Sequence, residues 1–379
     1  MSIQIHGQVA PGFEQVRDRF AANFERDDVY QEVGASLAVR QGENLVVDLW
    51  AGSRDAEGQI PWTADTLVNV WSTTKGVTAI ALAVLVDRGL IDYAAPVAHY
   101  WPQFAQAGKA EITVAQLLSH QAGLPGFEAP TPITDFYDWA TVTGRLAAQA
   151  PMWPPGTKNS YHAMTFGFLA GELIRRASGL SVGQFLAREI AGPLGADIFI
   201  GLPQSDEARV APLLAPRKEA PFDPDKMAPE ALMAVSNPAM VPTLANNRAW
   251  RAAEIPAGNG QATARGLARL YGAIANGGAL DGVRLMSPET VAALAQVQTE
   301  RVDLMLGVAP FWANGVTLNH TGIYGPRKSV FGHSGWGGSF GCADTHGRVA
   351  IGYVMNQMGE GIVGDERATA LCHAVYACL

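Results

Sequence analysis

The first part of the chain has apolar residues at helical spacing. Phe13, Val16, Phe20 and Phe24 lie three or four positions apart within residues 11–28. Positions at this spacing fall on one face of an α-helix, and the residues between them are mostly polar or charged. The pattern predicts an amphipathic helix that packs against the protein by its apolar face.

Short apolar, β-branched segments occur near both ends of the chain. Residues 34–42 (GASLAVRQG) and 44–52 (NLVVDLWAG) flank a polar turn, which predicts a β-hairpin. Near the other end, residues 328–358 predict consecutive strands with a turn at residues 344–347. Residues 365–379 follow as a closing helix. Strands are therefore expected from both ends of the sequence.

The middle of the chain has a mainly helical pattern interrupted by loops. Residues 125–160 contain several prolines, so we expect this segment to be rich in loops. Residues 200–260 are rich in Pro, Ala and Asn with weak periodicity, which predicts long loops. In the second of these segments we also expect short helices that form a lid or a pocket wall. Residues 74–92 are too long and too apolar for a strand and predict a buried helix. Helices with capping or stop residues are predicted at residues 112–124, 163–179, 263–278 and 287–298.

This order of elements predicts an α/β fold with a helical insertion. A sheet assembled from the two ends of the chain would leave the helical middle as an inserted region. We expect an α/β unit made of residues 1–75 and 285–379, in which both ends contribute to the sheet. The predicted second unit, residues 76–284, is mainly helical with long loops.

Composition narrows the functional classes. With 379 residues, 48% of them hydrophobic and 16% charged, the chain can bury a substantial core. Its net charge of −8 repels phosphate backbones, so we expect no nucleic-acid partner. No stretch is long and apolar enough for a membrane span, and the N-terminus does not resemble a signal peptide. We therefore expect a cytoplasmic protein without a membrane partner.

Ser72 and Lys75 are the first candidates for chemistry. They stand three positions apart at the start of the long apolar stretch of residues 74–92. Residues i and i+3 share a helix face, so the lysine amine can reach the serine oxygen. Burial lowers the pKa of a lysine and allows the amine to accept a proton. An ordinary capping serine beside a solvated lysine explains the same spacing equally well.

Two later segments offer partners for this pair. Tyr161 lies between a Pro/Gly-rich loop and an apolar helical stretch, where a tyrosine can hold or relay a proton. An ordinary half-buried tyrosine is the simpler explanation if it is taken alone. Residues 332–339 (GHSGWGGS) are glycine-rich, so their backbone can approach a substrate and donate an N–H group. A glycine-rich bend between strands is the alternative.

The ordered set of Ser-x-x-Lys, tyrosine and His-x-Gly resembles the serine β-lactamase/penicillin-binding-protein superfamily. Within it the chain is similar to class C β-lactamases and, more closely, to family VIII carboxylesterases. The resemblance implies a central antiparallel sheet flanked by helices, beside an all-helical domain, with the active site between them. Further matching stretches are residues 117–124, 153–174, 260–278 and 332–341.

The resemblance also implies roles for individual residues. Ser72 would be the nucleophile, and Lys75 and Tyr161 would share the role of general base. The backbone N–H groups of Ser72 and Trp336 would form the oxyanion hole. The substrate pocket would be lined by residues next to these motifs, namely Trp71, His333, Gly335, Trp336 and Gly337.

Two departures from the β-lactamase pattern favour an ester substrate. Where those enzymes carry Tyr-x-Asn, this chain has Ala163 after Tyr161 and His162. Where they carry Lys-Thr-Gly, it has His333, which is mostly neutral at pH 7. The chain lacks both polar anchors for an antibiotic, so we expect a small-molecule carboxylic ester with a small or medium acyl group. A weak β-lactamase, an acyltransferase of the same superfamily and a catalytically silent binding protein are the alternatives.

Other motifs are interpreted as structural. Residues 337–341 match G-x-S-x-G, but the residues after Ser339 predict a strand rather than the helix of a nucleophile elbow. Residues 359–364 match G-x-G-x-x-G, but no second strand follows, so we expect a turn and no dinucleotide. His120, His162 and His320 are scattered and make no ligand pair, so we expect neither a metal nor another cofactor.

Overall fold

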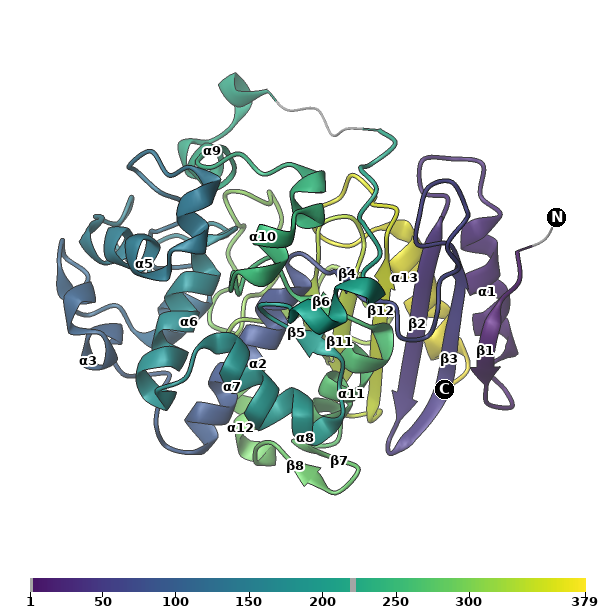
Figure 1. Ribbon diagram of the computed structural model, residues 1–379. Coiled ribbons are helices and arrows are strands. Elements are labelled where there is room, and N and C mark those ends of the chain that lie inside the picture. Colours follow the sequence, from purple (N-terminus) through teal and green to yellow (C-terminus); the bar gives the residue numbers. More distant parts are fainter. Residues whose placement is uncertain (1–2, 219–222) are drawn as a thin grey trace.

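A seven-stranded sheet is the largest β-structure of the protein (Figure 1). The computed structural model describes residues 3–218 and 223–379. All neighbouring strands of the sheet are antiparallel. In spatial order the strands are β1 (His6–Val9), β3 (Asn44–Gly52), β2 (Gly34–Gln41), β12 (Val349–Met355), β11 (Phe340–Asp344), β10 (Val330–Ser334) and β9 (Thr317–Leu318).

The two ends of the chain meet in the middle of this sheet. Strand β2 of the N-terminal hairpin pairs with β12 along its length, from Ala35 opposite Met355 to Gln41 opposite Val349. Every residue of β12 is buried, as is typical of a strand covered on both faces. The prediction of an antiparallel sheet built from both ends is confirmed.

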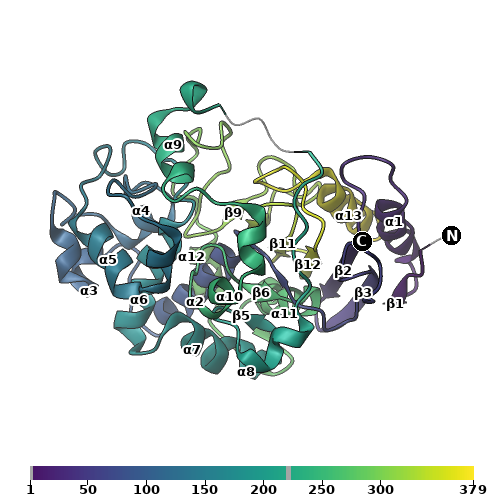
Figure 2. The ribbon, with the colours of Figure 1, turned by 45° about the horizontal axis from the view of Figure 1, so that its top comes forward.

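Helices flank the sheet. The predicted N-terminal and closing helices are α1 (Glu14–Phe24) and α13 (Glu366–Ala377), which pack side by side (Figure 2). The apolar positions Val16, Phe20 and Phe24 of α1 are buried, as their spacing predicts. Helix α11 (Ala264–Ala275) packs against β12, β2 and β11. The structure thus has the predicted α/β architecture.

Most remaining helices lie beyond one edge of the sheet (Figure 1). Helices α2 (Thr73–Asp87) and α6 (Thr165–Ser178) pack against each other, and both are largely buried. Gly179 ends α6 in a left-handed conformation, as expected for a C-terminal glycine. The other helices are α3 (Val97–Tyr100), α4 (Val114–Leu118), α5 (Trp139–Ala148), α7 (Val182–Leu186), α8 (Gly192–Leu194), α9 (Pro229–Ser236), α10 (Arg248–Ala252) and α12 (Pro288–Leu294).

One predicted boundary was wrong, and one helix was not predicted. Helix α5 lies inside residues 125–160, which we expected to be rich in loops; its Val142 and Leu146 are buried, and the helix packs on α6. Helix α4 ends at Leu118 rather than at the predicted glycine stop five residues later. Residues 200–260 do contain loops with short helices, although residues 219–222 lie outside the part of the chain that is described.

The division into two units stays a prediction. Helix α11 falls within residues 76–284 by sequence, yet it lies against the sheet. At this helix the predicted boundary between the two units does not match the packing, because a helix assigned to the helical unit covers the sheet. None of the described helices is long and apolar enough to cross a membrane.

A small second sheet positions the segments of the candidate site. Strand β4 (Val68–Asn69) ends just before the Ser-x-x-Lys motif and pairs with β6 (Gln261–Ala262), which also pairs with β5 (Ile198–Phe199). This pairing brings residues 257–262 against the start of α2. The remaining strands, β7 (Ala279–Leu280) and β8 (Val283–Arg284), form a separate hairpin.

Candidate active site

Ser72 stands at the N-terminus of the long buried helix α2. It is the N-cap residue, and the backbone N–H groups of Thr74 and Lys75 bond to the carbonyls of Trp71 and Ser72. Trp71, directly before it, has a φ of +43°, a left-handed conformation that is uncommon for a bulky residue. Strained backbone of this kind clusters at functional sites. The positive end of the helix dipole favours negative charge at the Ser72 oxygen.

Lys75 lies one helical turn behind Ser72 and is fully buried. Its Nζ atom is 2.9 Å from the Ser72 Oγ atom and 2.9 Å from the carbonyl oxygen of Ala257. Burial lowers the pKa of the lysine well below its ordinary value, because the charged ammonium loses its hydration. The geometry therefore places a proton acceptor against a serine hydroxyl.

The segment that supplies the Ala257 carbonyl is held to α2 by the small sheet. The amide side chain of Asn69 donates to the Gly258 carbonyl at 3.1 Å, and the Gly260 N–H donates to Thr74 Oγ1 at 2.9 Å. The Val70 N–H donates to the Gly260 carbonyl at 2.8 Å. These bonds surround the Ser-x-x-Lys turn. They fix the position of the Ala257 carbonyl, which accepts a hydrogen bond from Lys75, relative to Ser72.

Tyr161 completes the predicted group of three. It lies in the loop before α6, is buried, and its ring centre is 4.7 Å from Lys75 Nζ. Burial raises the pKa of its phenol above the ordinary value, and the nearby charge of Asp303 raises it further. A hydrogen bond with the Ser72 side chain opposes this shift. The phenol is therefore protonated at neutral pH and contacts the serine.

Aromatic rings that the sequence did not point to surround Tyr161. The indole of Trp312 stacks on it at 5.5 Å between ring centres and 9° between planes, and the His120 ring lies 4.9 Å away. Two of the three histidines interpreted as scattered lie together in space, because the His162 N–H donates to His120 Nδ1 at 3.1 Å. His162 itself accepts from the Leu124 N–H, so both rings hold backbone beside the site. The third histidine, His320, stacks on Phe311.

The glycine-rich turn after β10 lies against the start of α2. A Cβ atom at Gly335 would stand 2.1 Å from the Val70 carbonyl oxygen, so only glycine permits this approach. The Ser339 hydroxyl donates to the same carbonyl at 2.9 Å and contacts Thr73 Oγ1 at 3.1 Å. These contacts bring the turn that carries Trp336 next to the serine.

Two backbone donors are free at this place. Within the described residues, the N–H groups of Ser72 and Trp336 have no protein acceptor. The carbonyl of Gly337 is held by the Arg367 guanidinium at 2.8 Å and by the Gly359 N–H at 2.9 Å. Arg367 is fully buried and pairs with Asp365. The fixed carbonyl orients the peptide chain that follows Trp336.

The close approach at Gly335 leads to a testable expectation. We expect Gly335→Ala to lower kcat for the expected ester hydrolysis by about 100-fold, because a displaced turn misaligns the Trp336 N–H. The added methyl group also overpacks the site, at a cost of about 1–3 kcal/mol in the free energy of unfolding. Steady-state kinetics and thermal unfolding measure the two effects.

Gly144 offers a matched control on the exposed side of α5. A Cβ atom there meets no other atom within 4 Å, so Gly144→Ala should leave kcat unchanged and stabilise the helix slightly. Wild-type kcat in Gly335→Ala would show that the turn does not contribute to the reaction.

The two motifs interpreted as structural have ordinary surroundings. Ser339 is buried and its hydroxyl is engaged with Val70 and Thr73, while the residues after it form β11 instead of a helix. Residues 359–364 form the loop between β12 and α13. Residues 337–341 therefore lack the helix that a nucleophile elbow requires. Residues 359–364 do lie between a strand and a helix, but no strand follows α13 among the described residues, so the second half of a dinucleotide-binding unit is missing there.

The residues proposed to line the substrate pocket differ in exposure. Trp71 is 3% exposed and packs between Trp250 and Trp336, with ring centres 5.4 and 5.2 Å away. Trp336 is half-buried. His333 lies on β10 with Nδ1 2.8 Å from the Ser334 carbonyl oxygen, and burial lowers its pKa to about 3. Its imidazole is therefore neutral at pH 7.

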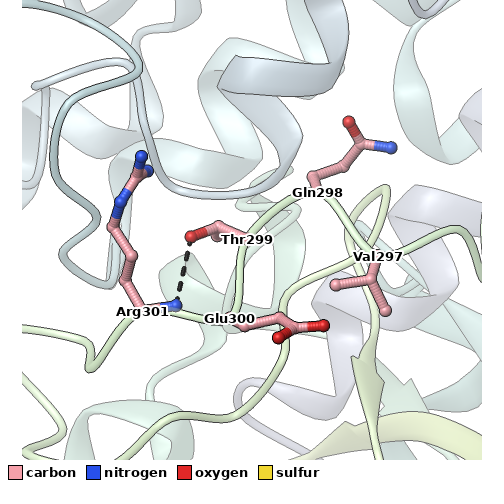
Figure 3. Close-up of a pocket in the computed structure, with 5 residues that line it drawn as sticks. All are labelled: Val297, Gln298, Thr299, Glu300 and Arg301. Atoms are coloured by element: carbon pink, nitrogen blue, oxygen red, sulfur yellow. Dashed lines mark hydrogen bonds between the residues drawn. The ribbon is translucent and has the colours of Figure 1, made fainter.

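A surface pocket of about 540 Å³ lies on the segment after α12 (Figure 3). It has no activated nucleophile, since its one hydroxyl, Thr299, accepts the Arg301 N–H and donates to Asn159 Oδ1 at 3.2 Å. The chemistry suggested by the geometry is therefore at Ser72. The pocket is lined by Val297, Gln298, Thr299, Glu300 and Arg301.

Comparison with known proteins identifies the family. The model of the β-lactamase family matches residues 20–374. An esterase/β-lactamase named LipL from Mycobacterium tuberculosis is 38% identical over 380 residues, covering 96% of this chain and 86% of LipL. Both matches extend far beyond the three motifs, over most of the chain.

Solved structures agree with this relationship. A family VIII carboxylesterase is 48% identical with a TM-score of 0.94, covering 100% of both chains. A penicillin-binding protein homologue from Caulobacter crescentus is 42% identical with a TM-score of 0.94, covering 99% of this chain and 100% of its own. With the family model matching most of its length, this chain belongs to the β-lactamase family.

Proposed function

We propose that the protein is a carboxylesterase that cleaves small-molecule esters through an acyl-enzyme intermediate on Ser72. The observation that carries the proposal is the buried Lys75 Nζ atom, 2.9 Å from the Ser72 Oγ atom. A neutral amine in this position activates a hydroxyl that is otherwise a weak nucleophile. Two relatives reported above, LipL and the family VIII carboxylesterase, carry esterase names.

The first step forms the acyl-enzyme. Lys75 takes the proton from the Ser72 hydroxyl as the oxygen attacks the ester carbonyl, and a bond forms between Oγ and the carbonyl carbon. The carbonyl electron pair moves to the oxygen, which becomes an oxyanion. The free N–H groups of Ser72 and Trp336 donate to this oxyanion.

The second step releases the alcohol. When the tetrahedral intermediate collapses, the bond from the carbonyl carbon to the alkoxy oxygen breaks and the leaving group needs a proton. The Lys75 ammonium supplies it, with the protonated phenol of Tyr161 as the relay between them. Water then attacks the acyl carbonyl and gives a proton to the same amine. The bond between the carbonyl carbon and Ser72 Oγ breaks, Oγ takes the proton back from Lys75, and the carboxylic acid leaves.

The surroundings of the site favour uncharged substrates. His333, which replaces the lysine of the β-lactamase pattern, is neutral because its pKa is lowered to about 3. Ala163 offers no amide to hold a polar side chain of a β-lactam. Without a fixed cation for a carboxylate, binding depends on apolar contacts with the acyl and alcohol groups.

A β-lactamase activity is the second candidate, because the name of LipL includes both activities. A lactam carbonyl needs the same nucleophile, base and oxyanion donors as an ester. The two activities differ in the groups that recognise the rest of the substrate.

A substrate panel separates these candidates. We expect kcat/KM for short-chain p-nitrophenyl esters to exceed that for a chromogenic cephalosporin by about 100-fold or more, because the polar anchors for the antibiotic are missing. Equal turnover of both classes would contradict the ester assignment. Transfer of the acyl group to an added alcohol, measured in the same assays, tests for acyltransferase activity.

A further inference from the structure

Asp303 is a buried carboxylate beside the site that the proposed reaction steps do not use. It is fully buried and lies in the segment between α12 and β9. This segment is far in sequence from Tyr161, which lies in the loop before α6. Buried carboxylates are costly unless their oxygens accept several hydrogen bonds. The hydrogen-bond donors of Asp303 therefore show which parts of the site this carboxylate holds in place.

One carboxylate oxygen of Asp303 binds backbone only. Oδ1 accepts from the N–H of Tyr161 at 3.0 Å, and from the N–H groups of Met305 and Leu306 at 3.0 and 3.1 Å. The peptide of the candidate proton relay is thus fastened to the loop of residues 303–308. The Leu304 N–H adds a bond to the Asn159 carbonyl at 3.1 Å, which joins the same two segments again.

The other oxygen holds the ring that stacks on Tyr161. Oδ2 accepts from the indole Nε1–H of Trp312 at 3.0 Å and from the Asn159 amide at 3.3 Å. The Trp312 indole stacks on the phenol ring of Tyr161, with an angle of 9° between the two ring planes. A single carboxylate therefore fixes both the backbone of Tyr161 and the ring against which its side chain packs.

We propose that Asp303 is a positioning residue that holds the Tyr161 hydroxyl in line with Ser72 and Lys75. This inference rests on the proposed function, in which that hydroxyl relays the proton. The five donors described above require a side chain with two acceptor oxygens, as an ionised carboxylate has. An asparagine at position 303 would replace one of these oxygens with an NH₂ group, which would face N–H donors. A small displacement of a group that transfers a proton lowers the reaction rate strongly, so a residue that holds the Tyr161 hydroxyl in place supports the reaction.

The test is a double-mutant cycle between Asp303→Asn and Tyr161→Phe, assayed on a short-chain p-nitrophenyl ester. If Asp303 acts through the hydroxyl, Asp303→Asn lowers kcat by about 10- to 100-fold with KM within about threefold. In the Tyr161→Phe background, where no hydroxyl remains to be positioned, the same change lowers kcat by less than about threefold. A residue that only stabilises the fold would give equal losses in both backgrounds.

Asp344→Asn is the matched control. Asp344 is also fully buried and accepts from the Arg327 guanidinium at 3.0 Å and from the Ser329 hydroxyl at 3.2 Å, at the end of β11. Its variant should lose thermal stability as Asp303→Asn does, yet keep kcat within about twofold of wild type. A comparable loss of kcat in Asp344→Asn would assign the effect of Asp303 to general destabilisation and overturn the inference.

A second variant keeps the test decisive if Asp303→Asn does not fold. Trp312→Phe removes the N–H bond to Oδ2 and keeps an aromatic ring beside Tyr161. We expect a smaller loss of kcat, about 5- to 10-fold, that disappears in the Tyr161→Phe background. Additive losses would overturn the positioning role, whereas wild-type kcat in Tyr161→Phe alone would overturn the relay itself.

Discussion

Ser72→Ala is expected to abolish ester hydrolysis while the protein stays folded. Removal of the hydroxyl leaves Lys75 and the oxyanion donors without a nucleophile, so kcat should fall by about 10⁴-fold or more. The side chain is small and lies at a helix N-terminus without a capping hydrogen bond to the backbone, so the melting temperature should barely change. Initial rates with p-nitrophenyl esters and a thermal unfolding curve give both readings.

Ser339→Ala is the control for this variant. Ser339 belongs to the G-x-S-x-G match, and its hydroxyl donates to the Val70 carbonyl. Its loss leaves a buried carbonyl with one donor fewer, at a cost of about 1 kcal/mol or more in stability. Most of the activity should remain. Inactivation of Ser339→Ala with full activity in Ser72→Ala would move the nucleophile to the second motif.

Lys75→Met should remove activity and change how stability depends on pH. Loss of the general base is expected to lower kcat by about 10²–10⁴-fold. Methionine fills a similar volume without an amine, so the variant avoids the cost of burying a group that water would hold as a cation. At neutral pH we therefore expect its stability to equal or exceed that of the wild type.

The sign of the pH effect follows from proton binding. In the wild type the pKa of Lys75 is lowered by burial, so below the ordinary lysine pKa the unfolded chain binds a proton that the folded protein does not. The stability of the wild type relative to Lys75→Met should rise by about 1.4 kcal/mol per pH unit between the lowered pKa and about 10.4. Denaturant titrations at several pH values measure this slope. A constant difference would mean that Lys75 is a buried cation and not the neutral base.

The fold was predictable where local pattern and long-range pairing agree. The hairpin β2–β3 and the strands β10 to β12 have strong alternating or apolar runs, and their position at the two ends of the chain predicts a shared sheet. Helix α5 was missed because Thr141, Val142 and Thr143 are β-branched and Gly144 follows them. Packing of its buried residues on α6 stabilises the helix in spite of these weak propensities.

The candidate site was also predictable only where its residues stand in local motifs. Ser72, Lys75 and Tyr161 stand in recognisable motifs, and the structure brings all three within contact. Asp303 and Trp312 lie in a segment of irregular structure, whose residues meet Tyr161 through contacts that span more than 140 positions. No periodicity or spacing encodes such contacts. Only the folded arrangement shows that a buried carboxylate supports the phenol.

Mapping of a trapped acyl group tests the central claim most directly. The protein, mixed with an excess of a slowly hydrolysed ester and quenched in acid, is analysed by intact mass and then by peptide mass spectrometry. The account predicts one added acyl group per chain, located on Ser72 and absent from Ser72→Ala. An acyl group on any other residue, or ester turnover without a covalent intermediate even in Tyr161→Phe, would contradict it.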